Sequence, residues 1–284
     1  MISASRLTPA LELKRRYLRQ ERLPMIFCPG CGIGVALKYV LWALEESGLE
    51  EDKVVWVSGI GCSSRVPGYV NFDSLHTTHG RALAFATGIK LANPELKVIA
   101  FMGDGDAIAI GGNHLIHAAR RNLDVTTIIV NNFNYGMTGG QIAPSTPHLY
   151  KGSSAPYGNY ERPFDISALV ASAGANYVAR WTILEHVHAV RSIKKALLKQ
   201  GFALVELLVP CPTYFGRRNG MRRPIELLRW LRENTVHVSR AQKMSQEELK
   251  GKIVIGEIVD RNEPGLVQMY MEYVKRAKLA MKSA

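Results

Sequence analysis

The chain has 284 residues, of which 47% are apolar and 21% are charged. This composition excludes a disordered chain, and a chain of this length buries enough surface to fold without disulfides. No apolar run is long enough to cross a membrane and residues 1–24 show no secretory signal pattern, so we expect a cytoplasmic protein without a membrane partner.

Most of the net charge of +12 lies near the two ends of the sequence. Residues 1–24 carry six basic and two acidic side chains, and residues 215–284 carry fifteen basic and eight acidic ones. The nearly neutral centre holds no zinc-finger or RNA-binding motif, so no nucleic-acid partner is expected. Basic termini fit a docking surface for an acidic protein better.

Short apolar strands alternate with helical segments along the chain, which predicts an α/β fold with a mainly parallel sheet. The strands are apolar on both faces and stop at Gly, Asn or Pro, as strands covered by two layers of helices do. The predicted strands are 54–58, 98–102, 126–130 and 203–209. The predicted helices are 33–47, 80–92, 112–121, 165–173 and 183–200.

The same pattern divides the chain into three parts. Residues 1–24 form a basic arm, residues 25–215 form the binding domain, and residues 216–284 form a basic extension that packs on the domain or on a partner subunit. The extension is predicted to contain helices near 224–234 and 264–282. Pro, Gly and Ser accumulate over residues 136–163, which indicates a functional loop rather than a connector.

Polar residues follow two neighbouring predicted strands. A GDG motif occupies 103–105 and an NN pair occupies 131–132. A right-handed crossover brings the carboxyl ends of both strands to one edge of the sheet, where open α/β sheets bind ligands. Carboxylate and amide oxygens suit Mg²⁺, and glycines let backbone N–H groups approach a diphosphate. The pattern predicts a magnesium–diphosphate site; the alternative is a tight turn beside an unrelated Asn pair.

The four cysteines are Cys28, Cys31, Cys62 and Cys211. One CxxC pair and two distant single cysteines fit zinc less well than two pairs would. A thioredoxin-type motif leaves two thiols unexplained. A [4Fe–4S] cluster uses four thiolates that can lie far apart in sequence, so the residues favour a cluster, with buried structural cysteines as the alternative.

These motifs together resemble a known family. GDG, NN and the following FNYGMTGGQ resemble the signature of thiamine-diphosphate enzymes. With FCPGCG, GIGCSSR and HTTHGRALAFATGIKLANP, they resemble the β subunits of 2-oxoacid:ferredoxin oxidoreductases over about residues 24–215, most closely the 2-oxoglutarate enzymes. The resemblance implies the thiamine-diphosphate-binding fold of the diphosphate domain, with thiamine diphosphate, Mg²⁺ and one [4Fe–4S] cluster.

The resemblance also assigns roles to residues. Mg²⁺ is expected on Asp104, Asn132 and the backbone carbonyl of Asn134, and the cluster on the four cysteines. The expected cofactor contacts are Ile60, Gly61, Cys62, Ser63, His79, Gly105, Asp106, Gly136, Met137 and Thr138. Arg65 is expected to bind the substrate carboxylate, because a guanidinium pairs with it through two hydrogen bonds; a surface arginine is the alternative.

The implied reaction is oxidative decarboxylation of a 2-oxoacid with coenzyme A to acyl-CoA and CO₂, with electrons passing through the cluster to ferredoxin, and it is reversible in principle. The expected substrate is 2-oxoglutarate, with pyruvate or branched-chain 2-oxoacids as alternatives. An α subunit would supply the pyrimidine-binding domain and its Glu in an (αβ)₂ assembly, and the chain would be active only with it.

Two other readings remain open at this point. A non-oxidative thiamine-diphosphate decarboxylase or synthase would bind the cofactor without iron. A non-catalytic iron–sulfur subunit would carry electrons without the cofactor. The cysteines argue against the first and the GDG and NN motifs against the second.

Overall fold

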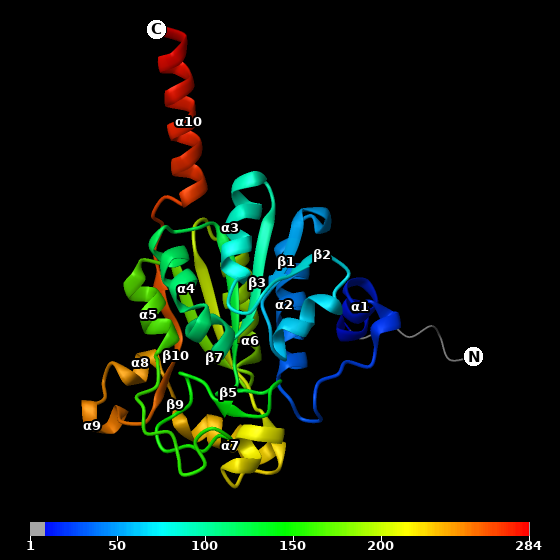
Figure 1. Ribbon diagram of the computed structural model, residues 1–284, viewed down its shortest axis with the longest axis vertical. Coiled ribbons are helices and arrows are strands. Elements are labelled where there is room, and N and C mark those ends of the chain that lie inside the picture. Colours follow the sequence, from blue (N-terminus) through cyan, green and yellow to red (C-terminus); the bar gives the residue numbers. More distant parts are fainter. Residues whose placement is uncertain (1–8, 284) are drawn as a thin grey trace.

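The computed structural model describes residues 9–283 and has an eight-stranded sheet at its centre (Figure 1). The strand order is β2-β1-β3-β4-β8-β7-β10-β9, and neighbouring strands are parallel except β7 and β10. The strands of this sheet are β1 (Val54–Ser58), β2 (Asp73–His76), β3 (Lys97–Gly103), β4 (Val125–Asn131), β7 (Tyr177–Thr182), β8 (Ala203–Leu208), β9 (Thr235–His237) and β10 (Ile253–Asp260). A separate hairpin pairs β5 (Asn134–Tyr135) with β6 (Gln141–Ile142).

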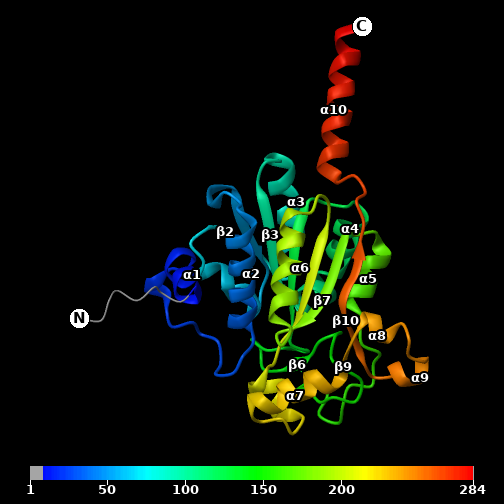
Figure 2. The same ribbon diagram turned by 180° about the vertical axis from the view of Figure 1, so that it is seen from behind.

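Helices cover both faces of the sheet, as Figures 1 and 2 show from opposite sides. On one face lie α2 (Ile33–Ser47) and α6 (His186–Leu198). On the other lie α3 (Ala82–Ala92), α4 (Gly112–Arg120) and α5 (Ile166–Ala173). Each face buries its own apolar core, which contains Trp56 and Phe101 on the first side and Leu83 and Leu115 on the second. This confirms a mainly parallel α/β fold whose central strands are buried on both faces.

The remaining elements lie at the ends of the sheet and in the two terminal regions. They are α1 (Pro9–Tyr17), α7 (Pro224–Asn234), α8 (Val238–Ala241), α9 (Gln246–Leu249) and α10 (Leu266–Ser283), with short π-helical turns at Asp106–Ile110 and Pro212–Gly216 and 3₁₀ turns at Gln20–Arg22, Glu51–Lys53 and Ser63–Gly68. No helix within residues 9–283 is long and apolar enough to cross a membrane.

Every strand and helix predicted between residues 33 and 209 is present, with ends that differ by at most three residues. Four strands of the sheet, β2, β7, β9 and β10, were not predicted. β9 has only three residues. β2 is exposed and polar. β7 carries Arg180, whose buried guanidinium contacts Glu206 at 2.7 Å, and this charge interrupts the apolar pattern. β10 lies in the predicted extension and pairs antiparallel with β7, so part of that extension belongs to the central sheet.

Candidate functional site

A pocket, called here the strand-end pocket, opens beyond the carboxyl ends of β1, β3 and β4. Its walls are the segments that follow these strands, together with the loop before α3. Its lining is Ile60, Gly61, Cys62, Ser63, His79, Gly103, Asp104, Gly105, Asp106, Asn132, Asn134, Tyr135, Gly136, Met137 and Thr138. Parallel strands end at one edge of the sheet, so residues distant in sequence meet there. The structure thus gathers all ten predicted cofactor contacts and the three predicted Mg²⁺ ligands around one pocket.

Asp104 is a buried carboxylate at the base of this pocket, and its chemistry fits a bound cation. Its side chain accepts a hydrogen bond from the Ser145 hydroxyl. Within residues 9–283 no basic side chain forms an ion pair with it. Burial raises the pKa of Asp104 to about 7. A buried carboxylate without a cation is costly, and the neighbouring oxygens of Asn132 and Asn134 complete a donor set that suits Mg²⁺.

The two residues of the NN pair have different roles. The Asn131 amide donates to buried Glu206 at 2.8 Å, while its Oδ1 accepts the N–H of Phe133 at 3.1 Å. Phe133 has a φ of +63°, and this turn directs the chain back toward the pocket. Asn132 lines the pocket, and the Asn134 amide donates to the carbonyl of Asn132 at 2.7 Å. Asn131 therefore holds the strand end, and Asn132 is the one of the pair that faces a ligand.

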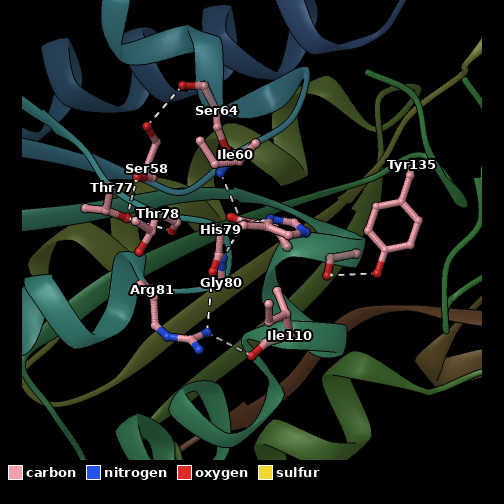
Figure 3. A network of polar contacts seen from close by, with 12 residues as sticks. Ser58, Ile60, Ser64, Thr77, Thr78, His79, Gly80, Arg81, Ile110 and Tyr135 are labelled. Atoms are coloured by element: carbon pink, nitrogen blue, oxygen red, sulfur yellow. Dashed lines mark hydrogen bonds and ion pairs between the residues drawn. The ribbon is translucent and has the colours of Figure 1, made fainter. Parts of the chain in front are cut away.

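Asp106 joins the loops around the pocket, and Figure 3 labels its partners Ile60, His79 and Gly80. Its Oδ1 accepts hydrogen bonds from the N–H groups of Gly80 at 2.7 Å and Ile60 at 3.2 Å, and it contacts His79 Nδ1 at 2.7 Å. An ionised carboxylate can only accept, so Nδ1 carries the proton and Nε2 is left for a pocket ligand. A Cβ at Gly59 would lie 2.2 Å from Asp106 Oδ2, so the close approach of these loops requires glycine there.

A second pocket, called here the cysteine cavity, adjoins the first. Its lining is Ile26, Phe27, Cys28, Cys31, Ile33, Cys62, Asn132, Gly136, Met137, Cys211, Pro212, Thr213 and Tyr214. It thus contains all four cysteines, and it shares Cys62, Asn132, Gly136 and Met137 with the strand-end pocket. Ligands bound in the two pockets would be separated by little more than these shared side chains.

The loop that carries Cys28 and Cys31 is held tightly. The Cys31 N–H donates to the Cys28 carbonyl at 2.9 Å, and Gly30 between them has a φ of +77°. A Cβ at Gly30 would lie 2.1 Å from the ring of Pro224, so the loop packs directly on the start of α7. Cys211 is buried on the opposite wall, with its sulfur 3.8 Å from Asn134 Oδ1.

The four thiols are free and crowded. Burial raises the pKa of Cys31 to about 12 and that of Cys62 to about 11, and repulsion from the other cysteines adds to both shifts. A bound metal reverses this preference, because it stabilises the thiolate. Within residues 9–283 no three His, Cys, Asp or Glu side chains converge on a point that would hold a single ion. Four thiols around one cavity fit a cluster better than zinc.

Arg65, the predicted substrate ligand, does not itself line either pocket, although Ser63 two residues before it lines the strand-end pocket. It is exposed on the 3₁₀ turn Ser63–Gly68, and its side chain forms no hydrogen bond or ion pair with another residue in the described chain. Its role in substrate binding stays a prediction.

Sequence reasoning missed two residues around the strand-end pocket. Tyr135 lines it and lies within a motif that had been noted for its neighbours. Ser145 holds the Asp104 carboxylate from a distance of 41 residues along the chain. Its only sequence signal is its place in the Pro-, Gly- and Ser-rich loop.

Comparisons with known proteins agree with this geometry. A family model described as "Thiamine pyrophosphate enzyme, C-terminal TPP binding domain" matches residues 54–207. The 2-oxoglutarate synthase subunit KorB of Methanothermobacter thermautotrophicus is 56% identical over 253 residues, which cover 89% of this chain and 88% of the relative. The same subunit of Methanocaldococcus jannaschii is 52% identical over 263 residues, which cover 93% of this chain and 97% of the relative.

A solved structure is also similar. It is the 2-oxoglutarate:ferredoxin oxidoreductase from Magnetococcus marinus with 2-oxoglutarate, coenzyme A and succinyl-CoA bound. It matches with a TM-score of 0.83 at 32% sequence identity, over 93% of this chain and 90% of that chain.

Proposed function

The chain belongs to the thiamine-dependent β subunits of 2-oxoacid:ferredoxin oxidoreductases, and we propose that it oxidises 2-oxoglutarate with coenzyme A to succinyl-CoA and CO₂. One observation carries the proposal beyond family membership: the strand-end pocket and the cysteine cavity share four lining residues. A site for breaking a carbon–carbon bond and a site for taking up electrons are thus adjacent.

When bound, thiamine diphosphate would supply the electron sink for loss of CO₂, and a [4Fe–4S] cluster would supply one-electron chemistry. The residues of this chain position them. Asp104, Asn132 and the carbonyl of Asn134 hold Mg²⁺ against the diphosphate, and Ser145 orients the Asp104 carboxylate through its hydroxyl. Burial keeps water from competing for these ligands.

His79 is positioned to act at the pocket wall. Asp106 fixes the proton on Nδ1 and holds the ring at 2.7 Å, so Nε2 can accept or relay a proton within the pocket. The same carboxylate holds the backbone of Ile60 and Gly80. Asp106 therefore acts as a positioning residue for two loops and one histidine.

The cysteines form the proposed electron route. Cys28, Cys31, Cys62 and Cys211 hold the cluster, and Cys62 also lines the strand-end pocket. The outer side of the cysteine cavity bears Cys28, which is exposed. A cluster held by these cysteines would supply one-electron chemistry next to the strand-end pocket and close to the surface at Cys28.

The arginines that follow Cys211 support ferredoxin as the electron acceptor. Arg217, Arg218 and Arg222 are exposed, and within residues 9–283 none of them forms an ion pair. They flank the segment whose Pro224 packs against Gly30 in the CxxC loop. An acidic electron carrier would be attracted to this surface beside the exposed side of the cavity.

The proposal also includes an α subunit as the partner and the cytoplasm as the cellular compartment. An α subunit supplies the pyrimidine-binding domain and its Glu, the assembly is (αβ)₂, and the β chain is active only within it. The four cysteines are free, which suits a reducing cytoplasm.

The experiment is an assay of the anaerobically purified α–β complex. We expect about four iron atoms and four sulfides per β chain, as one [4Fe–4S] cluster on four cysteines requires. We also expect reduction of methyl viologen that depends on both 2-oxoglutarate and coenzyme A. Pyruvate and a branched-chain 2-oxoacid serve as comparison substrates. Thiamine diphosphate without iron, or decarboxylation without viologen reduction, would instead establish a non-oxidative thiamine enzyme.

A further inference from the structure

Helix α10 leaves the molecule at the edge of the sheet opposite the two pockets. The pockets lie beyond the carboxyl ends of the strands, whereas α10 begins beside Asp124 and Gly201, which precede β4 and β8. Figures 1 and 2 show the helix projecting away from the sheet in both views. The helix therefore lies outside the catalytic site, and the reaction does not explain it.

The base of α10 is firmly fixed. The Asp124 carboxylate accepts hydrogen bonds from the N–H groups of Val267 and Gly201, both at 2.9 Å. The Asn122 amide donates to the two carbonyls before Gly265 at 3.2 and 3.0 Å. A Cβ at Gly265 would lie 2.3 Å from Asp124 Oδ1, so the approach requires glycine. The helix is thus held in a defined direction.

Beyond this base, α10 presents large apolar side chains to solvent. The exposed fractions are 45% for Met269, 50% for Tyr270, 70% for Tyr273 and 81% for Met281. At helical spacing these four residues lie on one face together with Val274. Single exposed apolar residues are common, but a continuous row of them marks an interaction surface. Tyr and Met are enriched at the centres of protein–protein interfaces, so this face suits a protein.

The other side of the helix is mainly basic, with Met271 and Leu279 exposed among the charged residues. Lys275, Arg276 and Lys278 are exposed, and within the described chain none of them forms an ion pair. Glu272 is the only acidic residue of α10, and it accepts a hydrogen bond from Gln268. A second copy of the helix would bring like charges together, whereas acidic side chains on a different protein would complement them.

We propose that α10 docks into an apolar groove with an acidic rim on a partner subunit of the oxidoreductase, a choice of partner that rests on the proposed function. Tyr270 and Tyr273 enter the groove, and Lys275, Arg276 and Lys278 face its rim. Because the fixed base sets the direction of the helix, the partner is held on the side of this chain away from the pockets.

The test is the double variant Tyr270→Ser/Tyr273→Ser, made in the assembled complex. We expect at least tenfold weaker retention of the partner subunits on the tagged chain, measured by titration and by light scattering after size exclusion. The variant chain alone should keep its thermal midpoint and its iron content, because both tyrosines lie outside the core. Val187→Ser, which changes a similarly exposed apolar residue on α6, is the control and should assemble normally. Unchanged assembly of the double variant would refute the docking.

Further experiments test the charge of the helix and the other binding partners that its apolar face could have. Lys275→Glu/Arg276→Glu/Lys278→Glu should weaken assembly and reverse its salt dependence, because added salt would screen the new repulsion from the rim; an unchanged salt dependence would refute the acidic rim. Self-association of the isolated chain that the tyrosine variant abolishes would identify a second copy instead. Binding to phosphatidylserine vesicles that the variant abolishes would identify a membrane instead. An assembled complex that fails to oxidise 2-oxoglutarate would refute the proposed function and leave the docking intact.

Discussion

The strand-end pocket takes its oxygen donors from residues that directly follow β3 and β4, whereas the cysteine cavity takes its sulfurs from loops as distant in sequence as Cys28 and Cys211. The first site follows from the direction of parallel strands, which end at one edge of the sheet. The second depends on packing between distant loops, such as that of Gly30 against Pro224. A substitution at a strand end should therefore affect only the ligand bound there. A substitution in the cysteine cavity can also disturb the packing between the loops that form it.

The largest effect is expected for Asp104→Ala. Loss of the buried carboxylate removes the anchor for Mg²⁺, so activity should fall by at least about a thousandfold, comparable to the loss of a central catalytic group. Thiamine content and iron content should be measured on the same sample, and only thiamine should disappear. Asp52→Ala, at an exposed turn residue, is the matched control. Retained thiamine would show that Asp104 is not the anchor.

Cys211→Ala should produce the reverse pattern. The variant is expected to lose the cluster and viologen reduction while it keeps thiamine diphosphate. Iron analysis and the visible absorption spectrum check this. Cys211 is buried and its substitution could impair folding, so Cys28→Ala, at an exposed position, is made in parallel. An intact cluster in both variants would mean that other residues ligate the iron.

Substitutions of Asn131 and Asn132 distinguish residues that bind the ligand from residues that support the pocket. Asn132→Ala should weaken Mg²⁺ binding by roughly 10–100-fold with little loss of stability. Asn131→Ala leaves a Glu206 oxygen without its 2.8 Å partner, so it should lower the free energy of unfolding by about 1–3 kcal/mol. Mg²⁺ titration and denaturant unfolding distinguish the two effects. Equal loss of metal affinity in both variants would contradict the division of roles.

A smaller effect is expected at the basic surface beside the cavity. Arg217→Gln/Arg218→Gln should raise the KM for ferredoxin several-fold, because exposed charges act mainly on encounter with the partner. The rate with methyl viologen should stay unchanged, since that small acceptor needs no docking surface. If both acceptors slow equally, the arginines support the cavity rather than the partner.

The smallest effect concerns stability at low pH. Partial burial favours the neutral form of Asp165, but the charge of Arg180 and hydrogen bonds to the carboxylate outweigh it and lower the pKa of Asp165. Its stabilising contribution is present above the unfolded-state pKa and disappears as the pH falls through the folded-state pKa. Asp165 is largely exposed, so Asp165→Asn should cost no more than the ~1 kcal/mol typical of surface pairs. The thermal midpoints of the two proteins should differ at neutral pH and converge in acid.

The sequence predicted the local features well. Strands such as β3 and β4 are short apolar runs that end in turn formers, and their ends already indicated where the polar residues meet. It did not predict β7, because the charge of Arg180 hides a buried strand whose guanidinium contacts Glu206 in the folded protein. It did not predict Ser145 beside Asp104, because no periodic pattern links residues on separate loops.

By itself, the sequence determined the apolar strands β1, β3, β4 and β8 and the helices between them, and which carboxylate, amides and thiols are available for chemistry. These depend on hydrophobic periodicity and residue type, which are local properties of the chain. Only the tertiary structure decided that Asn131 faces inward and Asn132 faces the pocket, that the four cysteines surround one cavity, and that α10 stands away from the sheet. Those outcomes depend on contacts between distant segments, where packing and hydrogen bonding select one arrangement among many that the local pattern allows.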